Sequence, residues 1–198
     1  IPLSRLGDIV DRLRTAIPTG ARVYWVCPLV DDSEVLDVTA ATERHAALSQ
    51  RFGDRVGLVH GRLKAPEKDA VMKRFADGDL DILVATTVIE VGVNVPEATI
   101  IVIEQAERFG LSQLHQLRGR VGRSARPSSC ILLYGEPLNE TAKSRLQVMR
   151  ETDDGFAIAE EDLRLRGAGE VLGTRQSGLP QFRMVDLTIH AELISAAR

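Results

Sequence analysis

The sequence predicts an α/β fold in which helices cover both faces of a parallel sheet and a helical appendage follows. Short apolar stretches alternate with segments whose apolar residues recur at helical spacing, as far as about residue 134. The strand-like stretches are apolar throughout, which is typical of strands buried on both faces. We therefore expect strands at residues 21–28, 56–59, 82–85, 99–103 and 130–134.

Helices are expected between and after these strands. Pro66 suits the first turn of a helix that Gly78 ends, and Ser112 can cap a short helix that carries Leu114 and Leu117. Beyond residue 134 the strand pattern stops, and two helical segments flank a break at residues 153–155. We therefore divide the chain into a sheet domain at 1–137 and a helical hairpin with a C-terminal helix at 138–198.

Composition limits the classes of function. The chain has 198 residues and a formal net charge of −3, so it does not bind nucleic acid through overall charge. Anion binding must then be local, and arginines gather at positions 118, 120, 123 and 126. No apolar run approaches the roughly 18 residues of a membrane span, no export segment is recognisable, and no cysteine or histidine spacing suggests a metal site. We expect a cytoplasmic protein with two buried thiols and no membrane partner.

Parallel sheets bind ligands at the carboxyl ends of their strands. The loops that follow Val26, Val59, Ala85 and Ile103 are therefore the places where we expect function.

Residues 116–123 carry the pattern G-R-x-G-R, in which Arg120 and Arg123 each follow a glycine. Because three residues are close to one helical turn, both guanidinium groups could point to the same side. Planar, permanently charged groups suit phosphate oxygens, and a second lobe can supply them as arginine fingers. The alternative is a cluster of surface salt bridges, which is less favoured because Gln116 lies four residues before Arg120.

The segment from Thr86 to Asn94 directly follows a predicted strand. Thr86 and Thr87 offer hydroxyl groups and amides to a nucleic-acid phosphate, Gly92 permits an unusual backbone conformation, and Asn94 can hydrogen-bond a ribose. An ordinary helix cap is the alternative.

In residues 60–63, Gly61 permits a tight turn and Arg62 could meet a backbone phosphate. A plain turn between a strand and a helix would explain the same residues.

The sequence contains no G-x-x-x-x-G-K-[ST] phosphate loop. The chain should therefore not hold a nucleoside triphosphate unaided, and it starts at Ile1 without an initiator methionine. We expect part of a longer enzyme that is inactive alone; a free-standing binding module without catalysis is the alternative.

In this order the three segments resemble motifs IVa, V and VI of superfamily 2 helicases. Residues 109–123 are similar to the version shared by the RecG and Mfd families, and residues 154–178 resemble the translocation motif of both. Residues 174–183 favour the RecG family, with the transcription-repair coupling factor Mfd as the alternative. The resemblance covers nearly the whole chain.

The resemblance implies a RecA-like second motor lobe of an ATP-dependent DNA helicase that remodels stalled forks and Holliday junctions. ATP and Mg²⁺ would be held mainly by an N-terminal RecA-like lobe of the same polypeptide. It implies roles for Arg120 and Arg123 at the γ-phosphate, for Gln116 in coupling, for Gly92 and Asn94 at the nucleotide, and for Gly61, Arg62, Thr86 and Thr87 on DNA. Arg166, Arg175 and Gln176 would belong to the translocation hairpin. Asn94 departs from the usual Asp of the family, which leaves its ribose contact open.

Overall fold

The computed structural model describes residues 1–28, 34–86, 98–122 and 126–166. Within these ranges five strands form one parallel sheet in the order β2-β3-β1-β4-β5. The strands are β1 (Arg22–Cys27), β2 (Val56–Val59), β3 (Ile82–Thr86), β4 (Ala98–Ile103) and β5 (Ser129–Leu132). The predicted parallel sheet is confirmed, and each strand lies within two residues of its expected position.

Six α-helices and four short 3-10 segments connect and follow these strands in the described ranges. The helices are α1 (Leu6–Ala16), α2 (Glu34–Phe52), α3 (Ala65–Asp77), α4 (Leu111–Arg118), α5 (Glu140–Glu151) and α6 (Gly155–Arg166). The 3-10 segments are Leu3–Arg5, Ile17–Thr19, Gly53–Arg55 and Ala106–Arg108. Gly78 ends α3 in the left-handed conformation, with φ of 90°, as its position predicts.

The two faces of the sheet bury separate hydrophobic clusters. Tyr24 and Val26 of β1 point into a cluster with α3, α4, α5 and α6, whereas Val23, Trp25 and Cys27 point into a cluster with α1 and α2. Every side chain of β1 after Arg22 is almost fully buried because each face is covered. Helices on both faces are thus confirmed.

The first residues of the chain continue the sheet beyond β5. Pro2 forms an isolated parallel bridge with Tyr134, and the Leu3 N–H donates to the Tyr134 carbonyl at 2.7 Å. The amino group of Ile1 donates to the Leu132 carbonyl at 2.9 Å. These contacts account for Tyr134, which the sequence placed in β5 and which pairs instead with the chain start.

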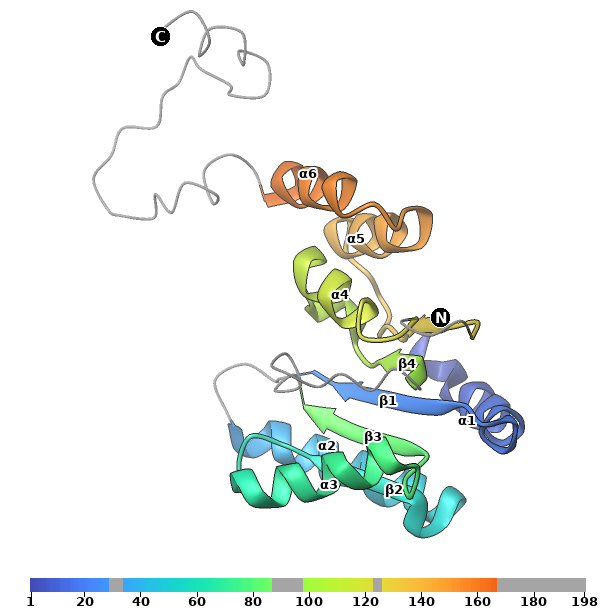
Figure 1. The fold of residues 1–198 in the computed structure, drawn as a ribbon. Coiled ribbons are helices and arrows are strands. Elements are labelled where there is room, and N and C mark those ends of the chain that lie inside the picture. The colour runs from blue at the N-terminus through green and yellow to red at the C-terminus, as the bar shows by residue number, and fades with distance from the viewer. Residues whose placement is uncertain (29–33, 87–97, 123–125, 167–198) are drawn as a thin grey trace, which may run out of the picture.

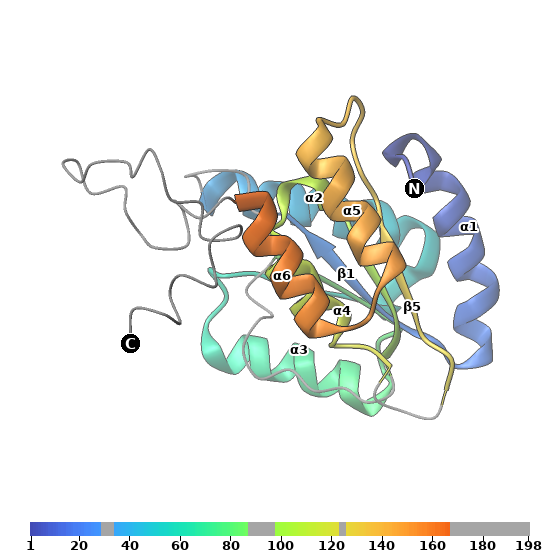
Figure 2. The same cartoon turned by 90° about the horizontal axis from the view of Figure 1, so that it is seen from above.

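The helices after β4 form a stack that leads away from the sheet. In Figure 1, α4 lies nearest the sheet, and α5 and α6 follow beyond it; Figure 2 shows the same stack from above. Asn139 caps α5 by accepting a hydrogen bond from the Ala142 N–H at 2.7 Å. Met149 of α5 and Ile158 of α6 are buried in the cluster that α4 shares with the sheet. The helical appendage is therefore packed on the sheet domain through α4.

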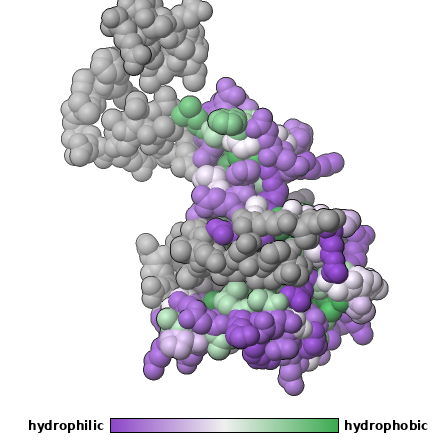
Figure 3. Space-filling model, in the orientation of Figure 1, coloured by the Kyte–Doolittle hydropathy of each residue, from purple (hydrophilic) through white to green (hydrophobic). Residues whose placement is uncertain are grey.

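On the face that Figure 3 shows, most of the coloured surface is hydrophilic. Hydrophobic side chains stand out over α6 in Figure 3, where Phe156 and Leu163 are the exposed large residues. No helix in the described ranges combines the length and apolar character that crossing a membrane requires.

Candidate functional site

The carboxyl ends of four strands are level with one another. In the register of the sheet, Val59 pairs with Ala85, Ala85 with Val26, and Val26 with Ile103. The segments that follow these residues therefore leave the sheet along one edge, as the sequence predicts. The candidate site is therefore expected along that edge of the sheet.

The turn after β2 is positively charged and exposed. Arg62 lies at the surface, and Lys68 reaches back from α3 to donate to the Gly61 carbonyl at 3.2 Å. The pKa of His60 is lowered from 6.5 by partial burial and then by the charges of Arg62 and Lys68. The Lys64 N–H donates to the Glu67 carboxylate at 2.9 Å and so caps the start of α3. Cationic side chains thus surround the exposed turn.

The structure places Thr86 inside the sheet. It is the last residue of β3, its side chain is 1% exposed, and its hydroxyl has no hydrogen-bond partner among the described residues. Thr87, Gly92 and Asn94 lie outside the described residues.

Helix α4 carries the start of the arginine segment. Leu111, Leu114 and Leu117 bury one side of the helix, which leaves Gln116 exposed. The sequence suggested Ser112 as the cap of this helix, but the cap is Gly110, two residues earlier. The Gly110 N–H donates to Gln113 Oε1 at 3.1 Å. Gln116 borders a cavity of about 200 Å³ between α4 and α6, whose other lining residues are Ser112, His115, Gly155, Ile158, Ala159 and Asp162. The Gln116 side chain therefore lies on the side of α4 that is next to α6.

Arg120 does not lie in a helix, although the spacing of the two finger arginines was read as one helical turn. Helix α4 ends at Arg118, and Arg120 lies in the turn that follows, where its N–H donates to the Leu117 carbonyl at 3.0 Å. Gly122 then takes a φ of 79°, which departs from helical geometry. Arg120 is half-buried. Arg123 lies outside the described residues, so the structure does not show the two side chains together.

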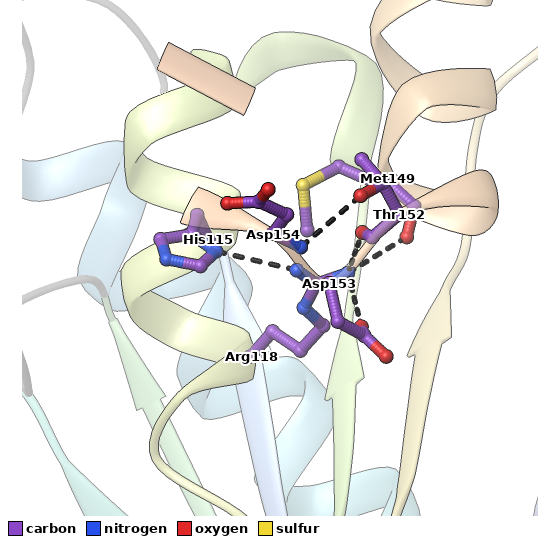
Figure 4. A network of polar contacts seen from close by, with 6 residues as sticks. All are labelled: His115, Arg118, Met149, Thr152, Asp153 and Asp154. Carbon is purple, nitrogen blue, oxygen red and sulfur yellow. Dashed lines mark hydrogen bonds and ion pairs between the residues drawn. The ribbon is translucent and has the colours of Figure 1, made fainter. Parts of the chain in front are cut away.

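The arginine cluster in the sequence separates in space. The Arg118 guanidinium turns to the end of α5, where it donates to the Met149 carbonyl at 2.9 Å and the Thr152 carbonyl at 2.8 Å (Figure 4). Arg126 donates to the Gly20 carbonyl at 3.2 Å, before β1. The guanidinium groups of Arg118 and Arg126 therefore bind backbone carbonyls in different parts of the chain.

A buried polar group was missed by the sequence reasoning. Glu104 follows β4, is 7% exposed, and accepts from Arg44 Nε at 2.5 Å and from Trp25 Nε1. Arg44 also lies 5.6 Å from the centre of the Trp25 ring. Burial, together with the Glu104 charge, raises the pKa of Cys27 far above its usual range. Only the position of Glu104 at the end of a strand hinted at a role.

Three further residues were expected in the translocation hairpin. Arg166 is the last residue of α6, whereas Arg175 and Gln176 lie outside the described residues. Among the described residues, no group of three His, Cys, Asp or Glu side chains could hold a metal ion.

Comparison with known proteins defines the class. Residues 8–125 match the helicase conserved C-terminal domain, more than half of the chain. The chain therefore belongs to that helicase family. Residues 152–198 match the C-terminal part of domain 3 of the ATP-dependent DNA helicase RecG. The predicted resemblance to RecG, rather than to Mfd, is thereby confirmed.

Full-length proteins that are similar in sequence to this chain carry the same name. The chain is 55% identical over 189 residues to the ATP-dependent DNA helicase RecG of Escherichia coli O157:H7, which covers 94% of this chain and 27% of that protein. It is 54% identical to the helicase of the same name from Acidithiobacillus ferridurans, covering 94% of this chain and 28% of that protein. The chain thus spans about a quarter of the length of these relatives.

Solved structures extend the comparison to the fold. A structure of RecG bound to a three-way DNA junction superposes with a TM-score of 0.74 and 43% identity, covering 98% of this chain and 25% of that one. Domain 2 of the DEAD-box helicase Mss116p, bound to an RNA duplex, superposes with a TM-score of 0.58 and 16% identity, covering 80% of this chain and 63% of that one. The second likeness concerns the fold alone, and it supports the predicted RecA-like lobe.

Proposed function

We propose that this chain is the second motor lobe and translocation hairpin of an ATP-dependent DNA helicase of the RecG type. The observation that carries the proposal is the likeness to RecG on a three-way DNA junction, which extends over 98% of the chain. Because the chain spans about a quarter of its relatives and has no phosphate loop, we place the N-terminal RecA-like lobe elsewhere in the same polypeptide. Branched DNA, such as forks and Holliday junctions, is the proposed substrate, and the cytoplasm the proposed location.

In this proposal the lobe completes an ATP site that it does not hold alone. Arg120 and Arg123 reach the γ-phosphate, where guanidinium groups stabilise charge that develops during phosphoryl transfer. Gln116 responds to the nucleotide, and Gly92 and Asn94 border it. Arg120 is half-buried and lies four residues after Gln116, in the turn that begins directly at the end of α4, so both residues can respond to the same nucleotide. ATP supplies the free energy of hydrolysis, and Mg²⁺ is held mainly by the other lobe.

We place the DNA backbone along the edge where the strands end. Gly61 and Arg62 are exposed there, and Lys68 adds a second positive charge beside them. Because the Thr86 hydroxyl is buried, we assign the direct phosphate contact to Thr87 and to backbone amides, with Thr86 anchoring their loop to β3.

The hairpin converts closure of the two lobes into movement along duplex DNA. It begins with α5 and α6, and Arg166, Arg175 and Gln176 are the residues proposed to act on the DNA. The packing of α5 and α6 on α4 supports this proposal, because α4 leads directly to Arg120.

The test compares the full-length protein with the isolated chain of 198 residues. ATP hydrolysis is measured with and without forked DNA, and circular dichroism checks that the isolated chain is folded. The proposal requires DNA-stimulated hydrolysis by the full-length protein and only background hydrolysis by the folded chain. Robust turnover by the chain would refute the divided ATP site, and no stimulation of the full-length protein would refute the helicase assignment.

A further inference from the structure

The guanidinium of Arg118 joins the end of α4 to the end of α5. Its side chain is 15% exposed, and Nη1 donates to the carbonyls of Met149 and Thr152 at 2.9 and 2.8 Å. Carbonyls at the C-terminal end of a helix lack partners within the helix, and a cation is favourable there. One planar group thus satisfies two backbone acceptors that lie 31 and 34 residues further along the chain.

His115, one turn before Arg118 on α4, lies between Arg118 and the start of α6. The other terminal nitrogen of Arg118 donates to His115 Nδ1 at 3.2 Å, because arginine has no acceptor atom (Figure 4). The far side of that ring faces Gly155, the first residue of α6, where an added Cβ would lie 3.2 Å from His115 Nε2. Arg118 therefore bonds the end of α5, and His115, which it contacts, lies close to the start of α6.

The ion pair of Arg118 with Asp153 contributes less to this junction. The two side chains approach to 2.9 Å, but that of Asp153 is 97% exposed. Exposed ion pairs are worth little, so the backbone carbonyls and His115 carry the contact.

The same arginine is tied to the turn that holds Arg120. The Arg120 N–H donates to the Leu117 carbonyl at 3.0 Å, and the Val121 N–H donates to the Arg118 carbonyl at 3.3 Å. Displacement of this turn must therefore move the end of α4, and with it the guanidinium of Arg118.

We propose that Arg118 is the positioning residue that transmits movement of the Arg120 turn to the elbow between α5 and α6. This inference rests on the proposed function, because it takes Arg120 as the group that senses the nucleotide. Arg118 itself touches neither nucleotide nor DNA in this account. Its loss should therefore separate ATP hydrolysis from movement on DNA rather than abolish both.

The test uses the full-length protein with Arg118→Lys, which keeps the charge but lacks the planar donors that reach three acceptors at once. DNA-stimulated ATP hydrolysis and strand separation are measured on the same three-way DNA junction, and the ratio of base pairs separated to ATP hydrolysed is compared. We expect hydrolysis to stay within about threefold of the unmodified protein and the ratio to fall about tenfold. Gly155→Ala, which crowds His115, should lower the ratio in the same direction by less.

Arg150→Lys is the matched control, since Arg150 is exposed on α5, and its ratio should be unchanged. An unchanged ratio in Arg118→Lys would overturn the inference, as would equal losses of hydrolysis and strand separation. Should Arg118→Lys fail to fold, an unchanged ratio in folded Gly155→Ala would overturn it equally. Absence of DNA-stimulated hydrolysis in the unmodified protein would instead refute the proposed function.

Discussion

Arg44 of α2 and Glu104, which follows β4, are joined by two hydrogen bonds of 2.5 and 3.0 Å beneath the edge that carries the candidate site. The Glu104 side chain is 9% exposed and that of Arg44 is 22% exposed. Trp25 donates to the same carboxylate from the neighbouring strand β1. The pair therefore fixes α2 to the sheet at the level where the functional loops begin.

Glu104→Ala should destabilise the fold. It leaves the Trp25 N–H and the Arg44 guanidinium without their acceptor, and removing one partner of a largely buried ion pair costs about 3 kcal/mol. Urea unfolding of the variant and the unmodified protein measures the difference in the free energy of unfolding. Arg44→Ala should also destabilise the fold, because it leaves Glu104 Oε2 without its donor and the carboxylate without its counter-charge, while Trp25 still donates to Oε1. Equal stability of Glu104→Ala and the unmodified protein would show that the pair contributes nothing.

His60 should report on the charge of the exposed turn. Its pKa lies below 6.5 because of partial burial and then the charges of Arg62 and Lys68, so Arg62→Gln should raise it. In the unfolded chain His60 takes up its proton near pH 6.5, whereas in the folded protein it does so only at lower pH. The free energy of unfolding is therefore highest above pH 6.5 and falls as the pH drops below that value. An NMR titration of the His60 ring measures the midpoint in both forms.

The same titration tests the proposed DNA contact. A phosphate bound beside Arg62 adds negative charge, so forked DNA should raise the His60 pKa in the full-length protein. The shift should be smaller in Arg62→Gln and unchanged in Arg150→Gln. A midpoint that DNA leaves unmoved would argue against a phosphate at this turn.

Gly57→Ala should destabilise β2. An added Cβ would lie 2.6 Å from Leu80 Cδ1 and 3.1 Å from Val71 Cγ1, inside a packed cluster. Overpacking of this kind costs about 1–3 kcal/mol. Gly7→Ala is the matched control, since nothing lies within 4 Å of its Cβ position, and in α1 it should raise stability by about 0.5 kcal/mol. Thermal unfolding that ranks the two variants in the opposite order would contradict the packing described for β2.

The cysteines should be unreactive in the folded protein. Burial raises the pKa of Cys130 to about 11, with Asp153 adding to the shift and Arg118 opposing it. Because the folded-state pKa is raised, the stabilising contribution is complete below the unfolded value near 9 and declines as the pH rises toward 11. Alkylation by iodoacetamide at pH 8, followed by mass spectrometry, should find Cys130 unmodified. Rapid labelling of the native protein would mean that the thiol is more accessible than described.

Local patterns in the sequence predicted the sheet well. Continuous apolar stretches located the five strands that the described residues form, and the end-of-strand rule identified the edge where His60, Thr86 and Glu104 lie. The order of the strands was not predicted, because it depends on which buried faces pair across the whole chain. Gly78 ended its helix as expected because that effect acts within a few residues.

Contacts between distant residues were beyond such reasoning. Arg44 lies 60 residues from Glu104, and Arg118 lies 31 residues from Met149, so no local pattern pairs them. Spacing also misled the placement of Arg120, because α4 ends two residues before it and the three-residue interval no longer describes a helical turn. A motif therefore predicted the kind of chemistry at the site but not the geometry of its side chains.

The central claim is that this lobe completes an ATP site with arginine fingers. The most direct measurement is DNA-stimulated ATP hydrolysis by the full-length protein with Arg123→Ala, alongside its affinity for a three-way DNA junction. Arg14→Ala, an exposed arginine on α1, serves as the control. We predict that Arg123→Ala lowers hydrolysis by about a thousandfold, the scale of an arginine finger, while affinity for the junction stays largely intact. Hydrolysis that survives in Arg123→Ala at the level of Arg14→Ala would contradict the account.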